Sequence, residues 1–344
     1  MKTDAPIAPR APHVGVSILG TGSAVPRSVL TNEVLTGMMD TSDEWIVQRT
    51  GIRERRVINR KEFGECTLTL SARALKGALA SARVDASELD LVILATMTPE
   101  MACPATSSRL VTEVGAGNAA AWDTSAACCS FVFAINSAYA MIRSGMYRCV
   151  GLVGADTLSV YMKYETAGRD TAILFGDGAG AVVFRATDDT RKGLIAQSMH
   201  TDGTRWAELY IPECEQDIPP DADENPHALG ELRMNGRAVF RFAVTTFGDL
   251  IQQTLDKAGL KASDVDHYVC HQSNARILAA ARERFGIPDE RMIVNIDRYG
   301  NTVSASVPLC FDELARSGRL HEGQRVMFLG FGGGLTWGSS LWQL

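Results

Sequence analysis

The chain has 344 residues, of which 46% are hydrophobic and 22% are charged, an ordinary composition for a globular protein with more than one structural unit. The formal net charge of -6 argues against a general nucleic-acid-binding surface, although a local basic patch could still bind an acidic partner. No apolar stretch is long enough to span a bilayer and residues 1–12 contain no signal-peptide core, so we expect a soluble, cytoplasmic protein.

Strand-like apolar runs alternate with amphipathic helical runs along the chain. The predicted strands are residues 15–20, 91–97, 119–123, 149–155, 267–270 and 292–295. The predicted helices are residues 68–82, 105–114, 129–143, 238–258, 275–285 and 304–317. This alternation predicts an α/β fold with mostly parallel sheets covered by helices. The acidic, Pro-rich segment 201–230 interrupts the pattern, and most loops of that length are lids or mobile segments.

Two stretches of the chain repeat one pattern. Residues 74–96 and 255–272 each read as a helix, a short linker and a buried strand. Each half also closes on a glycine-rich segment, at 172–184 and 326–338, which we interpret as a hairpin. The repeat predicts a duplicated α/β domain. We therefore divide the chain into a flexible extension at 1–13, a first half at 14–187 and a second half at 188–344.

Cys128 follows the predicted strand 119–123 and immediately precedes the helical run 129–143, so its thiol should lie at a strand-to-helix corner. The unpaired N–H groups and positive dipole of a helix N-terminus stabilise a thiolate, which is the nucleophilic form of cysteine. For a cysteine taken alone, packing in a turn is the commoner role. The eight cysteines are scattered without a C-x-x-C pair, which argues against a disulfide framework and against a zinc or other metal site.

Polar residues and glycines of the second half also lie between predicted elements. His271 stands at the C-terminal end of strand 267–270, the edge where open α/β sheets usually bind ligands. Asn301, considered alone, is typical of a turn or a helix cap. Glycines 330–334 could aim backbone N–H groups at an oxyanion or simply form a hairpin turn. The glycines of 176–180 precede a strand rather than a helix, so they fit neither nucleotide-loop pattern.

Taken together, these residues resemble the motifs of the thiolase-fold condensing enzymes, most closely the β-ketoacyl-acyl-carrier-protein synthase III family. The resemblance runs from about Val14 onward through residues 40–53, 126–128, 175–180, 271–274, 297–301 and 331–338. It implies a thiolase-like fold with duplicated halves in a five-layer αβαβα arrangement. It also implies a homodimer that needs no cofactor and takes a CoA thioester as substrate.

The resemblance implies a two-step reaction that initiates fatty-acid or related acyl-chain synthesis. Cys128 would take an acyl group from acyl-CoA, and malonyl-acyl carrier protein would then lose CO2 and condense with that group to give a 3-oxoacyl-carrier protein. His271 and Asn301 are expected to donate hydrogen bonds to the thioester oxygen that gains charge, and the N–H groups of Cys128 and Gly333 to hold the tetrahedral intermediate. Phe331 is expected to border the malonyl pocket.

The same resemblance assigns residues to binding. CoA would enter past Thr41, Trp45, Arg49, Arg169 and Asn274, with the adenine sandwiched between Trp45 and Arg169. The acidic carrier protein would meet Arg241, Arg276 and Arg284. Cys103 stands where short-chain-specific members have a bulky Phe that closes the partner's acyl channel. We therefore expect this chain to accept acyl groups longer than acetyl.

Several alternatives remain open at this stage. A relative in specialised, polyketide-type metabolism could transfer its acyl group to oxygen or nitrogen, or condense unusual substrates, although such acyltransferases often lose the Asn that is present here. A non-catalytic thiolase-fold subunit would be expected to have lost the Cys or the His. A cysteine hydrolase shares the Cys/His pairing but not the duplicated halves, and cofactor-dependent oxidoreduction lacks a matching glycine motif. Decarboxylative condensation is therefore the function that the sequence favours.

Overall fold

The computed structural model describes residues 14–220 and 229–344, so the N-terminal extension and part of the acidic segment lie outside the described residues. The strands are β1 (Gly15–Ala24), β2 (Ser28–Thr31), β3 (Glu54–Val57), β4 (Leu91–Ala95), β5 (Ala120–Thr124), β6 (Cys149–Asp156), β7 (Gly178–Thr187), β8 (Gly193–Thr201), β9 (Leu209–Tyr210), β10 (Arg233–Met234), β11 (His267–Cys270), β12 (Arg325–Gly332) and β13 (Thr336–Gln343). The helices are α1 (Asn32–Thr36), α2 (Asp43–Thr50), α3 (Arg60–Phe63), α4 (Thr67–Ala82), α5 (Thr106–Val114), α6 (Ser130–Arg143), α7 (Arg169–Ala172), α8 (Gly236–Ala258), α9 (Ala275–Phe285), α10 (Ile296–Tyr299) and α11 (Ser306–Arg316).

Two mixed sheets form the framework. The five-stranded sheet has the order β1-β7-β6-β4-β5, and the four-stranded sheet has the order β11-β12-β13-β8. Only the β4–β5, β4–β6 and β11–β12 pairs within them are parallel. The prediction of mostly parallel sheets is therefore wrong, because each half continues from its last parallel strand into antiparallel partners, β7 and β1 in one half and β13 and β8 in the other.

The internal repeat of the sequence is a repeat of structure. Helix α4 leads through a 3₁₀ turn at Ala86–Glu88 into β4, and α8 leads through a 3₁₀ turn at Ala262–Asp264 into β11. The second sheet then follows the order of the first, with β12, β13 and β8 in the places of β6, β7 and β1. Residues 292–295 take the place of β5 in the second sheet. They were predicted to form a strand, and this prediction is wrong, because they make only a single bridge, between Tyr268 and Met292.

The two glycine-rich segments fold differently. Residues 326–338 form the predicted hairpin, in which β12 and β13 pair up to Gly332 and Thr336. The hairpin predicted at 172–184 is wrong, because α7 ends at Ala172 and β7 begins only at Gly178. The intervening loop pairs instead with the second half, where the N–H of Gly176 donates to the carbonyl of Asn301 at 3.0 Å.

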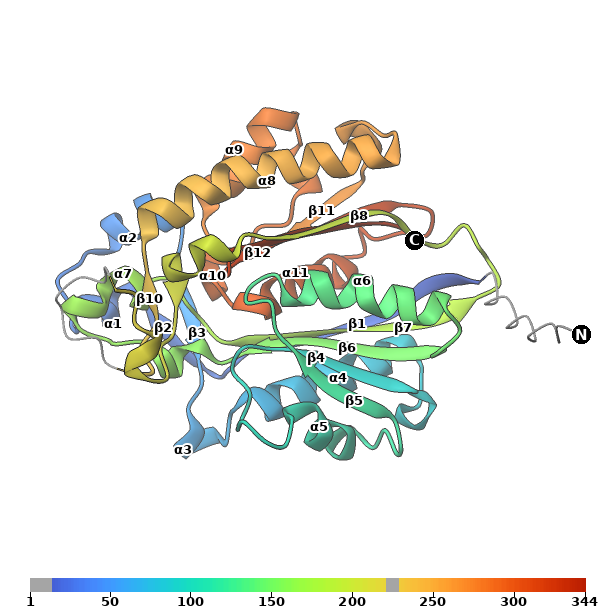
Figure 1. Cartoon of the computed structure of the whole chain (residues 1–344), viewed down its shortest axis with the longest axis horizontal. Coiled ribbons are helices and arrows are strands. Elements are labelled where there is room, and N and C mark those ends of the chain that lie inside the picture. The colour runs from blue at the N-terminus through green and yellow to red at the C-terminus, as the bar shows by residue number, and fades with distance from the viewer. Residues whose placement is uncertain (1–13, 221–228) are drawn as a thin grey trace, which may run out of the picture.

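Helices cover both faces of each sheet (Figure 1). Helices α4 and α5 lie on the outer face of the first sheet, α8 and α9 on the outer face of the second, and α6 and α11 lie between the sheets. Large buried side chains fill the space around these two central helices, including Phe131, Phe311, Phe328 and Trp342. Burying a side chain of this size stabilises a fold by about 1.5–3 kcal/mol. The central helices are consequently fixed in place, and both begin close to the candidate site.

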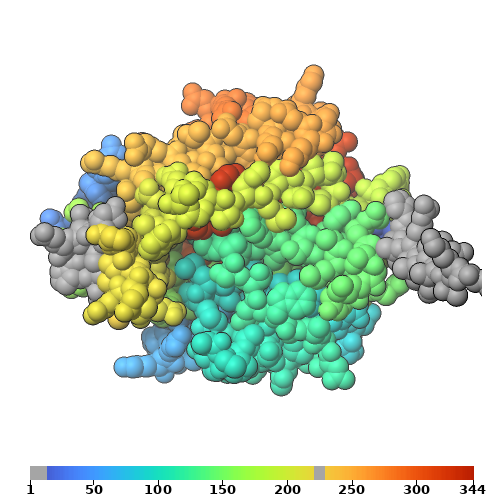
Figure 2. All heavy atoms as spheres, viewed as in Figure 1, coloured from blue at the N-terminus to red at the C-terminus, as the bar shows by residue number. Residues whose placement is uncertain are grey.

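The connections between the halves lie at the surface. Strand β7 ends at Thr187 and β8 begins at Gly193. The division of the chain into two domains between residues 187 and 188 stays a prediction. Residues 201–220 and 229–234, yellow in Figure 2, lie across the face where the two halves meet. They contain a 3₁₀ turn at Gly203–Glu208 and the β9–β10 pair. Among the described residues, no helix combines the length and apolar character that crossing a membrane requires.

Candidate active site

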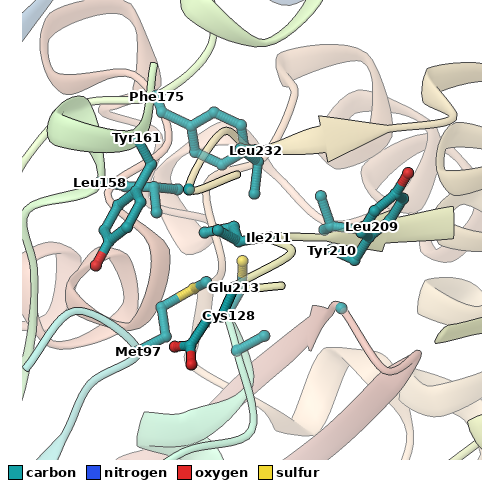
Figure 3. A pocket seen from close by; sticks show the side chains of 13 residues that line it. Met97, Cys128, Leu158, Tyr161, Phe175, Leu209, Tyr210, Ile211, Glu213 and Leu232 are labelled. Carbon is teal, nitrogen blue, oxygen red and sulfur yellow. The ribbon is translucent and has the colours of Figure 1, made fainter. Parts of the chain in front are cut away.

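Cys128 lies in the turn between β5 and α6. Ala127, just before it, has φ = +49°, a left-handed conformation that costs a residue with a Cβ about 1–2 kcal/mol. Ser130 secures this strained turn, because its Oγ accepts the N–H of Ala126 at 2.7 Å and donates to the Ala127 carbonyl at 2.6 Å. Thr336 Oγ1 from the neighbouring hairpin donates to the Ala126 carbonyl at 3.0 Å. Figure 3 shows the Cys128 sulfur pointing into a pocket toward Ile211.

Burial dominates the acidity of this thiol. Burial and, less strongly, the nearby Asp156 carboxylate raise the pKa of Cys128 to about 12, although a hydrogen bond from the backbone of Cys128 acts in the opposite direction. Asp156 is itself buried and accepts the N–H groups of Met97 and Ser304. The expectation that the helix N-terminus would favour a thiolate is therefore wrong, because burial outweighs it. The thiol is protonated at neutral pH and has to lose its proton when it attacks.

His271 follows β11 directly and is buried. Its Nδ1 lies 2.7 Å from Ser306 Oγ at the start of α11. The ring of Phe331 packs edge-on against the imidazole with centroids 5.4 Å apart, and Phe247 packs against Phe331 in turn. Burial lowers the pKa of His271 to about 3, so the imidazole is neutral and carries one N–H. It can therefore act as a hydrogen-bond donor from only one of its two nitrogens.

Asn301 lies between α10 and α11 and is also buried. Its backbone N–H donates to the Leu174 carbonyl at 2.8 Å, and its side-chain Oδ1 accepts the N–H of Val303 at 2.9 Å. The second contact is the local turn that the residue type alone suggested. Because Oδ1 is occupied, the amide is oriented with its Nδ2 donor group turned away from Val303.

The end of β12 comes unusually close to the nucleophile. A Cβ placed on Gly332 would lie 2.7 Å from the backbone nitrogen of Cys128, closer than any side chain could approach. Gly333 follows and lines the same pocket as Cys128 and Ala127. The glycines therefore do more than form a hairpin turn. They allow the end of β12 and the turn at Cys128, both of which carry backbone N–H groups, to lie in contact.

The pocket beside Cys128 has a volume of about 280 Å³ and is mostly apolar. Its lining includes Met97, Leu158, Tyr161, Leu209, Ile211 and Leu232, and among the described residues Glu213 adds the one carboxylate side chain (Figure 3). The sequence interpretation missed these residues, although apolar Leu209 and Ile211 stand out within the acidic segment. A space of this shape suits an apolar chain attached to the sulfur of Cys128.

Shared neighbours bring the three predicted site residues together. Phe175 lines the pocket with Cys128 and its backbone bridges to Asn301. The turn between Asn301 and Ser306 contacts the side chains of both Asn301 and His271. Cys128 thus comes from the first half, while His271 and Asn301 come from the second. No group of three or more potential metal-ligating side chains occurs within residues 14–220 and 229–344.

The predicted CoA entrance is partly closed. The guanidinium of Arg169 lies 4.9 Å from the centroid of the Trp45 ring, and that of Arg49 lies 4.5 Å from it. Two stacked contacts around an inserted adenine need about 7 Å, twice the usual carbon–carbon separation. The predicted sandwich between Trp45 and Arg169 therefore requires Arg169 to move, breaking its 2.7 Å hydrogen bond to the Asp40 carbonyl.

Two other predicted CoA contacts have different surroundings. Asn274 caps α9: its Oδ1 accepts the N–H of Arg276, and its Nδ2 donates to the Arg49 carbonyl, both at 2.9 Å. This amide therefore ties α2 to α9. Thr41 Oγ1 is buried and makes no hydrogen bond within the described part of the chain. Thr41 thus has an unused hydroxyl for a ligand, while Asn274 has only the second hydrogen of its Nδ2 group left to donate.

The other predicted contacts lie at the surface. Arg241 and Arg276 are exposed, with the guanidinium of Arg276 5.1 Å from the Phe240 ring. Arg284 pairs with Asp249 at 2.9 Å, which reduces the charge it offers to an acidic partner. Cys103 is exposed and does not line the pocket of its own chain. Its predicted role as a gate for a partner's channel stays a prediction.

Family models match both halves of the site. A model described as 3-oxoacyl-[acyl-carrier-protein (ACP)] synthase III matches residues 122–203, and one described as the C terminal of 3-oxoacyl-[acyl-carrier-protein (ACP)] synthase III matches residues 255–344. The first segment contains Cys128, and the second contains His271, Asn301 and Gly333.

Relatives and solved structures match over nearly the full length. The β-ketoacyl-[acyl-carrier-protein] synthase III of Erythrobacter litoralis is 43% identical over 330 residues, covering 95% of this chain and 99% of that protein. The 3-oxoacyl-[acyl-carrier-protein] synthase III from Aquifex aeolicus superposes with a TM-score of 0.87 at 38% identity, covering 96% of this chain and 100% of that one. The priming β-ketosynthase from the R1128 polyketide biosynthetic pathway also has a TM-score of 0.87, at 34% identity and 99% coverage of both chains.

Proposed function

Because the chain belongs to the 3-oxoacyl-acyl-carrier-protein synthase III family of thiolase-fold condensing enzymes, we propose that Cys128 carries an acyl group from acyl-CoA to malonyl-acyl carrier protein. The family makes the chain an acyltransferase that initiates acyl-chain synthesis. The residue roles are our proposal, and one observation carries it. The sole cysteine of the apolar pocket lies in a strained strand-to-helix turn against the glycine end of β12.

In the first step, Cys128 Sγ attacks the thioester carbonyl of acyl-CoA. The new S–C bond forms as the bond to the CoA sulfur breaks, and the thiol proton ends on the departing CoA, so the step is proton-neutral. The N–H groups of Cys128 and Gly333 stabilise the tetrahedral oxyanion in between. The acyl chain then occupies the apolar pocket, where burial contributes about 0.8 kcal/mol per methylene.

In the second step, malonyl carried on its carrier protein loses its carboxylate as CO2, and the electron pair of the broken bond forms an enolate. His271 and Asn301 donate hydrogen bonds to the enolate oxygen, each worth about 3–4 kcal/mol in the transition state. The enolate carbon attacks the acyl-cysteine carbonyl and expels the Cys128 thiolate, which takes up a proton. Phe331 borders this space, and its apolar ring favours loss of a carboxylate.

Intact-protein mass spectrometry tests the proposal directly. Wild type is incubated with a panel of acyl-CoAs from acetyl to long chain, without a malonyl donor, beside Cys128→Ala and the matched Cys129→Ala. A mass gain of one acyl group in wild type and Cys129→Ala, but not in Cys128→Ala, supports the assignment. Labelling that persists in Cys128→Ala, or no labelling by any acyl-CoA, refutes Cys128 as the CoA-primed nucleophile.

A role in specialised metabolism is the second candidate, favoured by the likeness to the priming β-ketosynthase of a polyketide pathway. The acceptor and product test the reaction of either candidate. Acyl-labelled enzyme mixed with malonyl-acyl carrier protein should give a 3-oxoacyl-carrier protein in a condensing enzyme of either pathway, whereas formation of an ester or amide instead would identify a specialised acyltransferase to oxygen or nitrogen. A homodimer, docking of the carrier protein beside Arg241, Arg276 and Arg284, and a cytoplasmic location remain part of the proposal.

A further inference from the structure

One short turn orients both hydrogen-bond donors of the site. It runs from Asn301 to Ser306, and its Val303 has φ = +54°, a conformation that a β-branched residue rarely adopts. The N–H of Val303 binds Asn301 Oδ1 at 2.9 Å and thereby turns Nδ2 outward. Ser306 Oγ reaches His271 Nδ1 at 2.7 Å from the other end of the same turn. The turn therefore contacts each side chain at the atom that does not donate to the substrate, Oδ1 of Asn301 and Nδ1 of His271.

The contact to His271 decides more than the ring's orientation. Both His271 and Ser306 are 1% exposed, so water does not compete for Nδ1. A neutral imidazole holds its proton on either Nδ1 or Nε2, and the hydrogen bond at one nitrogen sets the state of the other. If the Ser306 hydroxyl donates to Nδ1, Nε2 carries the N–H. If the hydroxyl instead accepts from Nδ1–H, Nε2 is bare and cannot donate to an enolate.

The neighbours of Ser306 favour donation to His271. The hydroxyl has one hydrogen and two acceptors in reach, His271 Nδ1 at 2.7 Å and the Val303 carbonyl at 3.0 Å. The Val303 carbonyl already accepts the backbone N–H of Ser306 and also lies within hydrogen-bonding range of the His271 ring, so it does not need the hydroxyl. The N–H of Gln272 faces Ser306 Oγ at 3.4 Å, which supplies a donor to the oxygen. The hydroxyl hydrogen of Ser306 therefore lies in the shorter contact, the one to His271 Nδ1.

We propose that Ser306 is a positioning residue that donates its hydroxyl hydrogen to His271 Nδ1 and so fixes the tautomer with the proton on Nε2. This inference rests on the proposed function, in which His271 Nε2–H stabilises the enolate. Ser306 itself does not touch the substrate. Its contribution belongs to condensation, because the acylation step uses the N–H groups of Cys128 and Gly333.

The tautomer is measured first, on unmodified protein. Long-range ¹H–¹⁵N correlation on ¹⁵N-histidine-labelled wild type separates protonated from bare ring nitrogens, and His271→Asn assigns the signal. The proposal expects a proton on Nε2 in wild type and a redistribution toward Nδ1 in Ser306→Ala, where the Val303 carbonyl remains as a hydrogen-bond acceptor for the ring. A wild-type spectrum with the proton on Nδ1 overturns it. The wild-type measurement requires no substrate, and only the assignment of its signal depends on a folded variant.

The two half-reactions are then timed separately. Acylation is followed by mass spectrometry with acyl-CoA alone, and condensation by single turnover of pre-acylated enzyme with malonyl-acyl carrier protein. We expect Ser306→Ala to slow condensation about 10- to 100-fold, the usual scale for losing a partner that orients a functional histidine, and to change acylation less than about 3-fold. Ser306→Thr retains the hydroxyl and should keep most of the condensation rate.

A matched control removes the same kind of bond elsewhere. Ser317 lies at the far end of α11, and its Oγ donates to the carbonyl of Leu314 at 2.7 Å. This is the same bond to a carbonyl three residues earlier that Ser306 can make to Val303. Ser317→Ala should leave both half-reactions unchanged. Condensation by Ser306→Ala within about 3-fold of wild type overturns the inference. If wild type is never acylated, the proposed function fails instead, and the tautomer measurement still decides the role of Ser306.

Discussion

Replacing Gly332 by alanine should slow the acylation of Cys128 without changing the Cys128 side chain itself. The added Cβ would lie 2.7 Å from the Cys128 nitrogen, 2.9 Å from its Cβ and 3.2 Å from its Cα. Ordinary contact begins at 3.4 Å, so the two segments must separate by about 0.7 Å. Backbone lies on both sides, so no side-chain rotation can relieve the overlap. The displaced groups are the sulfur of Cys128 and the adjoining N–H groups.

The size of the effect follows from that displacement. A misplacement of 1 Å can cost about 100-fold in rate, so 0.7 Å should slow acylation of Cys128 on the order of 25-fold. Overpacking of this kind also lowers the free energy of unfolding by about 1–3 kcal/mol. The rate loss should therefore exceed what partial unfolding explains, because a domain of this size remains folded after such a loss.

The assay is the rate of acyl-enzyme formation with one acyl-CoA, measured by intact mass beside urea unfolding of the same samples. Gly330→Ala is the matched control two residues earlier on β12. Its Cβ first meets the ends of side chains, Val132 Cγ2 at 3.1 Å and Cys129 Sγ at 3.2 Å, which can give way. Acylation of Gly332→Ala within about 3-fold of both wild type and Gly330→Ala would refute the steric argument.

Three further predictions follow from groups around the site. Unfolded His271 binds a proton below about pH 6.5, but the folded residue, with a pKa of about 3, does not, so its contribution to stability falls as pH drops. By pH 5 the loss is about 2 kcal/mol, and urea unfolding at pH 7 and pH 5 should show it in wild type but not in His271→Asn; equal pH dependence in both proteins would contradict it. Cys103→Phe should lower acylation by long-chain acyl-CoAs while sparing acetyl-CoA, and equal activity on long chains would remove Cys103 as the gate. Arg169→Ala should raise KM for acyl-CoA about 2- to 30-fold, the range of one cation–π contact, and leave acyl-pantetheine kinetics unchanged; an equal change for both substrates would place Arg169 elsewhere.

The sequence predicted the parts of the site whose signals are local. Cys128 stands between a short apolar strand and a helix, and that succession alone indicates a corner. The repeated helix, linker and strand likewise predicted both halves, because each copy closes its linker with the same 3₁₀ turn. These features depend on neighbours along the chain, so the residues themselves reveal them.

The features that the sequence could not predict depend on contacts across the chain. The segment 172–184 has the composition of a hairpin, but its loop pairs with Asn301, which lies far away in sequence. The helix N-terminus beside Cys128 suggested an acidic thiol, yet burial, a property of the whole fold, raises its pKa instead. Ser306 reads as an ordinary serine at a helix start until folding brings it against His271.

The duplicated architecture also bears on how such a site arises. The central helices α6 and α11 hold equivalent places in the two halves, and one follows Cys128 while the other follows Asn301. A symmetric pair of identical half-length chains would have to present the same side chain at both places, either two thiols or two amides. Joining the copies in one polypeptide releases that constraint. One copy can specialise in bond formation and the other in charge stabilisation, and the strand reduced to a single bridge at Met292 shows the same freedom to diverge.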